Sequence, residues 1–286
     1  MKLVHSYLTQ QKINGNWPDT ASFFRSFALS FLLARKHFDR VELVTDSLGS
    51  YLLKDLLGLQ YQGIDKELEN MKGRYPDSYW AAGKVRAYQI QNQPFCHIDG
   101  DVYLIKPPKH VFNAPVVFQG PEDADMHKGA YKLQSFKNNF PDIPESWKWC
   151  FNSTGKKQYA VNMGLYACNN LTINRRYCKE YFDFLESQGN REVYSASGFN
   201  DWGLNISLEQ FTASAVCRMF GIQPKYIVDR YWWPVDWSMD YVHLVWLYKG
   251  EAEHNNRVLE MLKAIAPKYI SRADLAAEAL EKEFSK

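Results

Sequence analysis

The chain has 286 residues, within the range of a single α/β domain, and its 34 basic and 32 acidic residues leave a net charge of +2 that gives no general attraction to nucleic acid. Its five cysteines are odd in number and form no C-x-x-C pair, which argues against a disulfide scaffold and a structural zinc site. No apolar run approaches the roughly 20 residues that span a bilayer, and the N-terminus lacks the apolar core of a signal peptide, so we expect a cytoplasmic protein without a transmembrane segment.

Strands and helices alternate in the first part of the chain. Asp19 or Thr20 is expected to cap the first helix, Asp46 or Ser47 to cap the second, and Gly58 to end the second. Alternation of this kind predicts a parallel sheet with helices on its faces, whose ligands lie at the carboxyl ends of the strands. The predicted strands are 2–9, 40–46 and 95–104, and the predicted helices are 17–38, 48–57 and 78–91.

The second part of the chain begins with a segment of poor periodicity, residues 120–158, which we interpret as an inserted and partly irregular loop region. The helix at 206–221 is expected to end at Gly221, and the last helix to be capped by Ser271. These patterns indicate one α/β domain, residues 1–250, followed by a C-terminal helical extension, residues 251–286. The remaining predicted strands are 157–169 and 224–229, and the remaining helices are 174–188, 206–221, 251–266 and 271–284.

Two aspartates stand one residue apart in "FCHIDGDVYLIKPP", residues 95–108. On an extended backbone Asp99 and Asp101 point to the same side, and Gly100 between them permits close approach of a ligand. Convergent carboxylates repel each other unless a cation lies between them, and hard oxygen ligands select Mg²⁺ or Mn²⁺. The pair therefore predicts a metal site that takes a nucleotide or a phosphate; the alternative is that Asp99 caps a turn and Asp101 is solvated.

The sequence around this pair resembles the D-x-D strand of GT-A fold glycosyltransferases. In that family the motif binds the divalent ion that holds the diphosphate of a nucleotide sugar. "AAGKVRAYQI" resembles the preceding helix of the glycogenin and lipopolysaccharide galactosyltransferase group, in which a lysine, here Lys84, contacts the donor. "VNMGLYACN" resembles the N-x-G strand of the same group, carried here by Asn162 and Gly164.

Two later blocks resemble the same group. "DWGLN" is similar to D-Q-G-L-N, with Asp201 retained and Trp202 in place of glutamine. "HLVWLYKG" has the spacing of H-x-x-G-x-x-K-P-W, in which the histidine, here His243, completes the metal site and the lysine, here Lys249, binds the phosphates. Trp246 replaces the glycine of that block.

The matching blocks run from residue 1 to about residue 250. The resemblance thus implies a single GT-A-like domain with a mixed central sheet, of the Rossmann-like nucleotide-diphospho-sugar transferase type. It implies Mn²⁺ or Mg²⁺ as cofactor, a nucleotide-diphosphate sugar as donor and a glycan or other hydroxyl as acceptor. Assembly of a cell-surface polysaccharide would be one such use.

Two carboxylates compete for the acceptor side of the reaction. The resemblance implies a retaining enzyme with Asp201 near the reacting face of the donor sugar, whereas Glu209 at a helix start would be the general base of an inverting enzyme. The nucleotide base is expected near Tyr7 and Asp46, at the ends of the first two strands. An aromatic cluster, Tyr231, Trp232, Trp233 and Trp237, is the predicted acceptor wall or lid.

Two other functions remain open from the sequence. A haloacid-dehalogenase-like phosphatase also follows a strand with D-x-D, and Asp99 would then be its nucleophile. A non-catalytic sugar-binding protein would use the aromatic residues and a degenerate metal site, and would have no need of His243 and Lys249.

Overall fold

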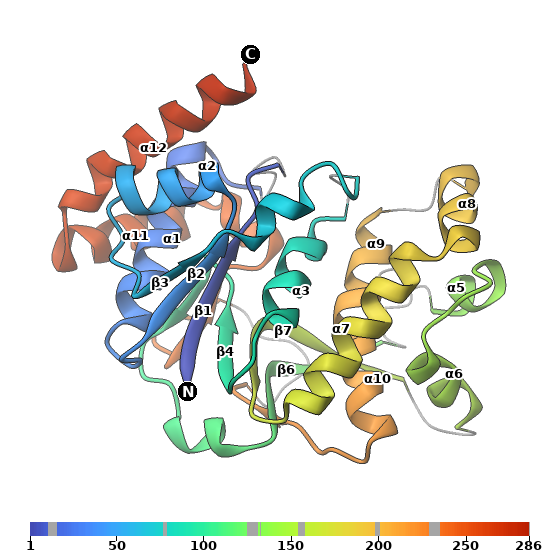
Figure 1. Ribbon diagram of the computed structural model, residues 1–286. Coiled ribbons are helices and arrows are strands. Elements are labelled where there is room, and N and C mark those ends of the chain that lie inside the picture. The colour runs from blue at the N-terminus through green and yellow to red at the C-terminus, as the bar shows by residue number, and fades with distance from the viewer. Residues whose placement is uncertain are drawn as a thin grey trace. The chain divides into compact units, whose positions relative to one another are not determined.

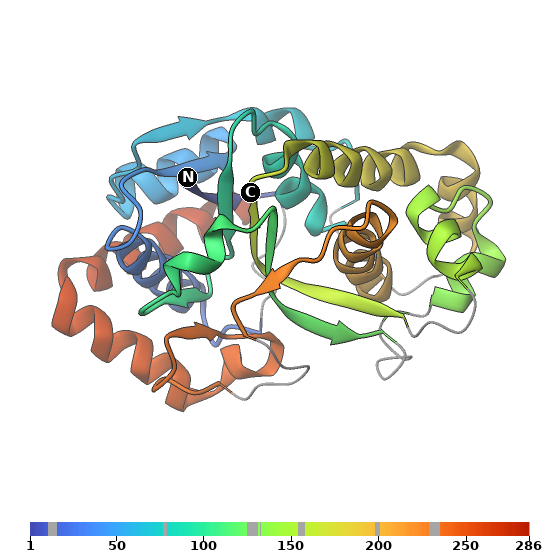
Figure 2. The same ribbon diagram turned by 90° about the horizontal axis from the view of Figure 1, so that it is seen from below.

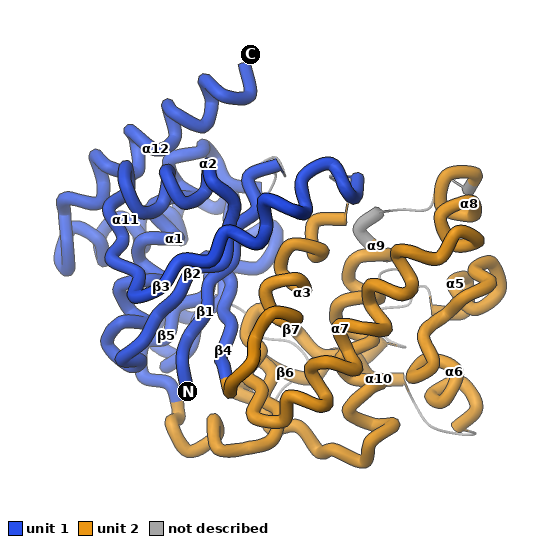
Figure 3. Tube along the Cα trace, in the orientation of Figure 1, with its two compact units in different colours: residues 1–77, 95–107, 234–286 blue, residues 78–94, 108–233 orange. Residues whose placement is uncertain are grey.

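The computed structural model describes residues 1–10, 16–76, 79–124, 131, 133–153, 158–197, 201–228 and 235–285, with the side chains of residues 201 and 202 outside that description. The chain forms two units, each assembled from separate stretches of sequence (Figure 3). Unit 1 comprises residues 1–77, 95–107 and 234–286, and unit 2 comprises residues 78–94 and 108–233.

Unit 1 is built on four parallel strands in the order β3-β2-β1-β4. Aliphatic residues such as Leu3, Val41 and Leu43 are fully buried, as expected for strands covered on both faces. The carboxyl ends of these strands therefore present the residues that follow them, including Asp46 and Asp99, at one edge of the sheet. The strands are β1 (Lys2–Tyr7), β2 (Val41–Thr45), β3 (Gly63–Asp65) and β4 (Phe95–Ile98).

Helix α1 (Thr20–Ala34) begins as predicted, with the Asp19 carboxylate accepting a hydrogen bond from the amide of Ser22. It packs against the last two helices, α11 (Ala252–Ile265) and α12 (Lys268–Phe284), which lie beside it in Figure 1. The predicted C-terminal helical extension is thus confirmed.

One detail of the predicted helices is wrong, and the second predicted helix is present but differs in type. Helix α12 begins at Lys268, after Pro267, so Ser271 lies inside the helix and does not cap it; a proline suits the first turn because its missing N–H has no partner there in any helix. The second helix is short, α2 (Ser47–Ser50), and continues as a π-helical turn, η1 (Tyr51–Leu56). Gly58 follows it with φ +80°, as a helix-ending glycine should.

The predicted strand 95–104 is interrupted. The chain turns after β4, where the amide of Val102 donates to the carbonyl of Asp99 at 3.1 Å. Strand β5 (Val102–Leu104) then pairs antiparallel with β9 (Tyr241–His243) in a separate two-stranded sheet. The two aspartates therefore lie on a turn, and the expectation that an extended backbone brings them together is wrong.

Unit 2 contains a second set of strands. β6 (Val116–Asp123) pairs antiparallel with β7 (Tyr159–Cys168), side by side in Figure 2, and parallel with the short β8 (Lys225–Tyr226). Parallel and antiparallel pairs together confirm the mixed strand directions of an α/β fold. The helices in the described part of unit 2 are α3 (Ala81–Gln89), the 3-10 helix η3 (Lys109–Asn113), α5 (Leu133–Asn139), α6 (Glu145–Asn152), α7 (Leu171–Glu186), α8 (Gln188–Ser197), α9 (Asp201–Ile206), the π-helical η4 (Ser207–Phe211) and α10 (Thr212–Met219).

The segment 120–158 is more regular than predicted, because it contains the end of β6 and the helices α5 and α6. Trp147 of α6 is fully buried and donates from its indole N–H to Thr212 Oγ1 at 2.9 Å. Its ring packs against Phe136, Phe184 and Phe211. The aromatic side chains of this segment thus build a core, a role that a weak periodicity did not reveal.

The cysteines and the membrane prediction can also be compared with the structure. All five cysteines are buried free thiols. In the part of the chain that is described, no helix has the length and apolarity needed to cross a membrane. The division at residue 250 into a transferase domain and an extension stays a prediction.

Asp46 offers a direct test of this fold. Its fully buried carboxylate accepts hydrogen bonds from the amide and hydroxyl of Thr9 (2.8 and 2.7 Å) and caps α2 at the amide of Gly49 (2.7 Å). Because Asp46→Ala leaves three buried donors without an acceptor, we expect it to lower the free energy of unfolding by about 3 kcal/mol in urea titrations.

Asp55, an exposed aspartate of the following π-helical turn, is the matched control. Asp55→Ala should change stability by less than about 0.5 kcal/mol. Equal effects of the two substitutions would contradict a structural role for Asp46.

Candidate functional site

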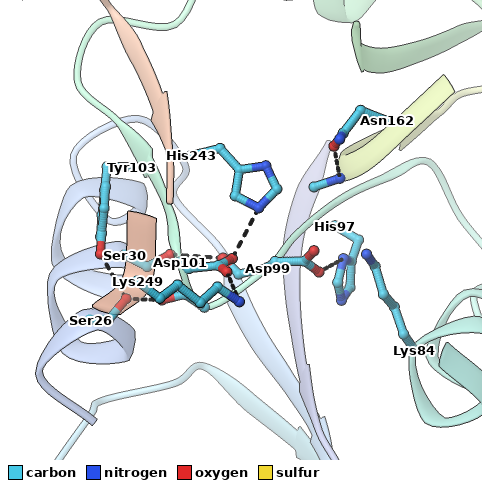
Figure 4. Close-up of polar contacts among 12 residues, drawn as sticks. Ser26, Ser30, Lys84, His97, Asp99, Asp101, Tyr103, Asn162, His243 and Lys249 are labelled. Carbon is cyan, nitrogen blue, oxygen red and sulfur yellow. Dashed lines mark hydrogen bonds and ion pairs between the residues drawn. The ribbon is translucent and has the colours of Figure 1, made fainter. Parts of the chain in front are cut away.

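The pairing of β5 with β9 brings His243 beside the aspartate turn. Val102 lies opposite His243 in the register, and the amide of Leu244 donates to the carbonyl of Asp101 at 3.1 Å. One ligand atom each from Asp99, Asp101 and His243 lies within 4.8 Å of the others. Figure 4 shows the side chains of Asp101, His243 and Lys249 pointing toward one another. Three potential metal ligands from separate parts of the sequence thus share one location in unit 1.

Helix α1 holds the turn that carries the two aspartates. Ser26 donates to the carbonyl of Gly100 at 2.9 Å, and Ser30, one helical turn later, donates to the carbonyl of Asp99 at 3.3 Å. The ring of Phe27 packs so closely that a Cβ at residue 100 would lie 2.3 Å from its Cδ2. The turn therefore requires glycine for close packing.

Asp101 is the electrostatic centre of the group. Its Oδ2 lies 2.6 Å from Lys249 Nζ and its Oδ1 lies 3.3 Å from His243 Nε2, with 9% of the side chain exposed. Burial alone would raise the pKa of Asp101. The charge of Lys249, and after it that of His243, instead holds the pKa well below its usual range, so the carboxylate is ionised.

The donor set fits Mg²⁺ or Mn²⁺. Two carboxylates and an imidazole are suitable ligands for either ion. Asp101 Oδ1 is buried and makes no hydrogen bond of good geometry, so this oxygen keeps a lone pair for a cation. Asp99 is 28% exposed, so solvent reaches at least this one of the three residues.

Two residues near this group were missed by sequence reasoning. His97, almost fully buried on β4, has its Nδ1 3.9 Å from Asp99 Oδ1 and its Nε2 2.8 Å from Ser6 Oγ. Its position two residues before Asp99 was a usable signal, because such residues share a side of a strand. The ring of Trp17 lies 5.7 Å from Lys249 Nζ, and nothing in the sequence links the two.

The residues predicted to meet the nucleotide base lie in the core of unit 1. Tyr7 is 9% exposed and packs against the rings of Phe23, Phe24 and Phe27. The nearby His5 is fully buried, and burial lowers its pKa to about 3, so it is neutral. The carboxylate of Asp46 accepts hydrogen bonds from Thr9 and Gly49. The base-binding roles of Tyr7 and Asp46 stay predictions.

Unit 2 brings two other predicted residues together. Lys84 Nζ lies 2.8 Å from Glu209 Oε1, and the two side chains are only 11% and 1% exposed. A buried ion pair of this kind must stay intact, because removing one partner leaves an uncompensated charge. Lys84 and Glu209 therefore fix each other's side-chain position. This is true whether Lys84 or Glu209 contacts a substrate.

Asn162 and Gly164 lie on β7 in the same unit. The Asn162 side chain accepts from the amide of Gly164 at 2.9 Å and donates to Glu122 Oε1 at 2.8 Å. Tyr131 bonds the other oxygen of that carboxylate, and its hydroxyl lies 2.5 Å from Gln210 Oε1. Burial, and after it the charge of Glu122, raises the pKa of Tyr131 far above its usual range, so the hydroxyl keeps its proton.

The structure describes only some of the remaining predicted residues. Asp201 begins α9, and its side chain lies outside the described residues, as do Tyr231, Trp232 and Trp233. Trp237 is described and stacks on Tyr103, with ring centroids 5.1 Å apart.

Trp246 occupies the position of the glycine in the H-x-x-G-x-x-K block and has φ +47°, in the left-handed region that favours glycine. Its side chain is 61% exposed.

The sequence of the chain matches a family of unknown function, DUF6734, over residues 1–274. The chain belongs to this family. No curated protein matches the DUF6734 chain.

Solved structures of low sequence identity resemble it. The galactosyltransferase LgtC in complex with donor and acceptor sugar analogues has a TM-score of 0.44 and 12% identity, over 95% of this chain and 100% of that chain. Mouse xyloside xylosyltransferase 1 has a TM-score of 0.41 and 12% identity, over 78% and 84% of the two chains. The 4-diphosphocytidyl-2C-methyl-D-erythritol synthase from Anaerococcus prevotii DSM 20548 has a TM-score of 0.37 and 12% identity, over 92% and 99%. Since all three scores are below 0.5, a functional proposal must rest on the residues of the DUF6734 chain itself.

Gly100 tests the geometry of the aspartate turn. Gly100→Ala places a methyl group against the buried ring of Phe27, so we expect a loss of about 1–3 kcal/mol in the free energy of unfolding and weaker Mn²⁺ binding by calorimetry. In the double variant Gly100→Ala/Phe27→Leu, the smaller side chain makes room for the methyl group. The double variant should then lose less stability than the sum of the two single variants. Strict additivity would show that the contact between Gly100 and Phe27 does not shape the turn.

Proposed function

We propose that this DUF6734 protein is a divalent-metal-dependent glycosyltransferase that moves a sugar from a nucleoside-diphosphate donor to a hydroxyl group of a glycan or other acceptor. The observation that carries the proposal is the convergence of Asp99, Asp101 and His243, with Lys249 2.6 Å from Asp101. Two carboxylates and an imidazole are suited to hold the ion, and an ammonium beside them is suited to a diphosphate. The order of these residues along the chain is also that of the D-x-D and H-x5-K blocks.

Within this proposal each side chain has a distinct task. Mn²⁺ or Mg²⁺ bound by Asp99, Asp101 and His243 supplies Lewis-acid stabilisation of the charge on the diphosphate. His97, with its Nδ1 3.9 Å from Asp99 Oδ1, is proposed to act on that carboxylate as an outer-shell partner does in metal sites. Lys249 is held beside Asp101 and over the ring of Trp17, where its ammonium group adds positive charge for a phosphate.

The stereochemical outcome proposed is retention. The carboxylate of an inverting base must be available to the acceptor hydroxyl, whereas Glu209 Oε1 is engaged by Lys84 at 2.8 Å. That pairing disfavours Glu209 as the base and leaves Asp201 as the carboxylate proposed to lie near the reacting face. Lys84, Asn162 and Gly164 are proposed to contact the donor. Tyr7 and Asp46 are proposed to lie near the nucleotide base of the donor.

The two alternative functions are less well supported. A phosphatase that uses Asp99 as nucleophile gives no role to the imidazole and ammonium gathered on Asp101. A purely sugar-binding protein has no use for a carboxylate oxygen that is buried beside two other metal-ligand candidates.

Calorimetry with nucleoside diphosphates tests the proposal. We expect at least one of UDP, GDP and CDP to bind in the presence of Mn²⁺ and not in EDTA. Asp101→Asn, which keeps the shape of the side chain and removes its charge, should weaken this binding about 100-fold or more. Asp55→Asn, at the exposed control position, should bind as the wild type does.

A transfer or hydrolysis assay over nucleotide sugars with Mn²⁺ should then give a product that is lost in the same Asp101→Asn variant. Metal-independent binding of every nucleotide, or Asp101→Asn protein with wild-type affinity, would refute the proposed function. A phosphoaspartate trapped at Asp99 would favour the phosphatase instead.

A further inference from the structure

An open cavity of about 490 Å³ lies at the surface of unit 1, and no role in the proposed transfer has been given to it. Its volume is typical of small-molecule sites, which span roughly 300–1,000 Å³. The four residues from α11 are spaced so that they share one face of the helix. The cavity is lined by Trp237, Ser238, Glu253, Asn256, Arg257 and Glu260.

Trp237 is a rigid aromatic surface in this cavity. Its ring stacks on Tyr103 with centroids 5.1 Å apart and an interplanar angle of 25°. Its indole N–H donates to His254 Nδ1 at 3.3 Å, and His254, itself buried, lies 3.3 Å from Glu251 through its other nitrogen. The orientation of the indole is thus set before any ligand arrives, so binding costs little ordering entropy.

The polar lining specifies the kind of ligand. Carboxylate, amide and guanidinium groups are planar and present paired donors or acceptors, which suit adjacent hydroxyl groups. An indole face suits the C–H surface of a pyranose ring. Glu253 and Glu260 outnumber Arg257, which lies 3.5 Å from Glu260, so the local charge is negative and disfavours a phosphate or an acidic sugar.

From these observations we infer that the cavity binds a neutral saccharide unit. The site is structurally linked to the aspartate turn, because the Tyr103 hydroxyl lies 2.7 Å from Ser26 Oγ, which also donates to the carbonyl of Gly100. Ser26 of α1 therefore bonds both the aspartate turn and Tyr103, the residue on which Trp237 stacks. Under the proposed function, on which this role rests, the saccharide is a distal unit of the acceptor glycan; the binding itself needs neither metal nor nucleotide.

Saturation-transfer NMR on the full chain in EDTA tests the inference. The probes are lactose, maltose, cellobiose and diacetylchitobiose as neutral sugars, with glucuronate and glucose 1-phosphate as anionic comparators. We expect at least one neutral disaccharide to bind and the anionic sugars not to bind. Trp237→Leu should weaken that binding about tenfold or more.

Two substitutions at exposed positions keep the inference testable if the Trp237→Leu variant does not fold. Asn256→Ala and Glu260→Ala change side chains on the solvent-facing side of α11 and should also weaken binding, whereas Glu278→Ala, an exposed control on α12, should not. Failure of all four neutral sugars to bind, preference for an anionic sugar, or unchanged affinity in Asn256→Ala and Glu260→Ala would each overturn the inference.

The two proposals can fail separately, because the sugar is measured in EDTA and the nucleoside diphosphate in Mn²⁺. Sugar binding without nucleotide binding would leave this inference standing and end the transferase proposal. The reverse result would end the inference alone.

Discussion

The buried carboxylate of Asp101 is the constraint on which the rest of the site depends. A charge removed from water is tolerated only when it is paired, and here the partners are the ammonium of Lys249 and the imidazole of His243. Both partners lie far along the chain from Asp101. The antiparallel pairing of β5 with β9 is therefore required to compensate this charge as well as to gather the three ligand candidates.

Helix α1 connects this charge to the outer layer of unit 1. Ser26 and Ser30 are fully buried, where an unsatisfied hydroxyl would be costly, and they donate hydrogen bonds to the carbonyls of the turn. The outer part of the same helix holds α11 and α12, and Arg25 Nη2 lies 2.5 Å from Asp274 Oδ1 of α12. The C-terminal helices thus support the helix that positions the aspartates, and α11 supplies one wall of the inferred saccharide site.

Much of the fold could be predicted from local patterns. Residue Asp19 before the first helix, Gly58 after the second, and the short apolar segments of β1 and β2 are short-range signals, and they predicted these elements to within a few residues. The break between β4 and β5 was not predictable, because "HIDGDVYL" reads as one strand unless it is known that β9 pairs with its second half. Long-range pairing of this kind overrides local propensity.

The candidate site could be predicted from the sequence to a similar extent. Asp99 and Asp101 could be named because two carboxylates one residue apart suit a divalent ion, whereas His243 and Lys249 were named from the resemblance of "HLVWLYKG" to the H-x5-K block. His97 was missed although it lies two residues from Asp99, and Ser26 and Ser30 were missed because serines in an apolar helix look like tolerated neutral residues. Their roles depend on which helix covers which turn, and that information exists only in the folded chain.

The most direct test of the account is pulsed electron paramagnetic resonance of Mn²⁺ bound to the protein. The account predicts nitrogen coupling from one imidazole, which should disappear in His243→Gln and persist in His110→Gln, a substitution of an exposed histidine in unit 2. Bound Mn²⁺ that shows no nitrogen coupling, or coupling that survives in His243→Gln, would contradict the claim that Asp99, Asp101 and His243 hold a common ion.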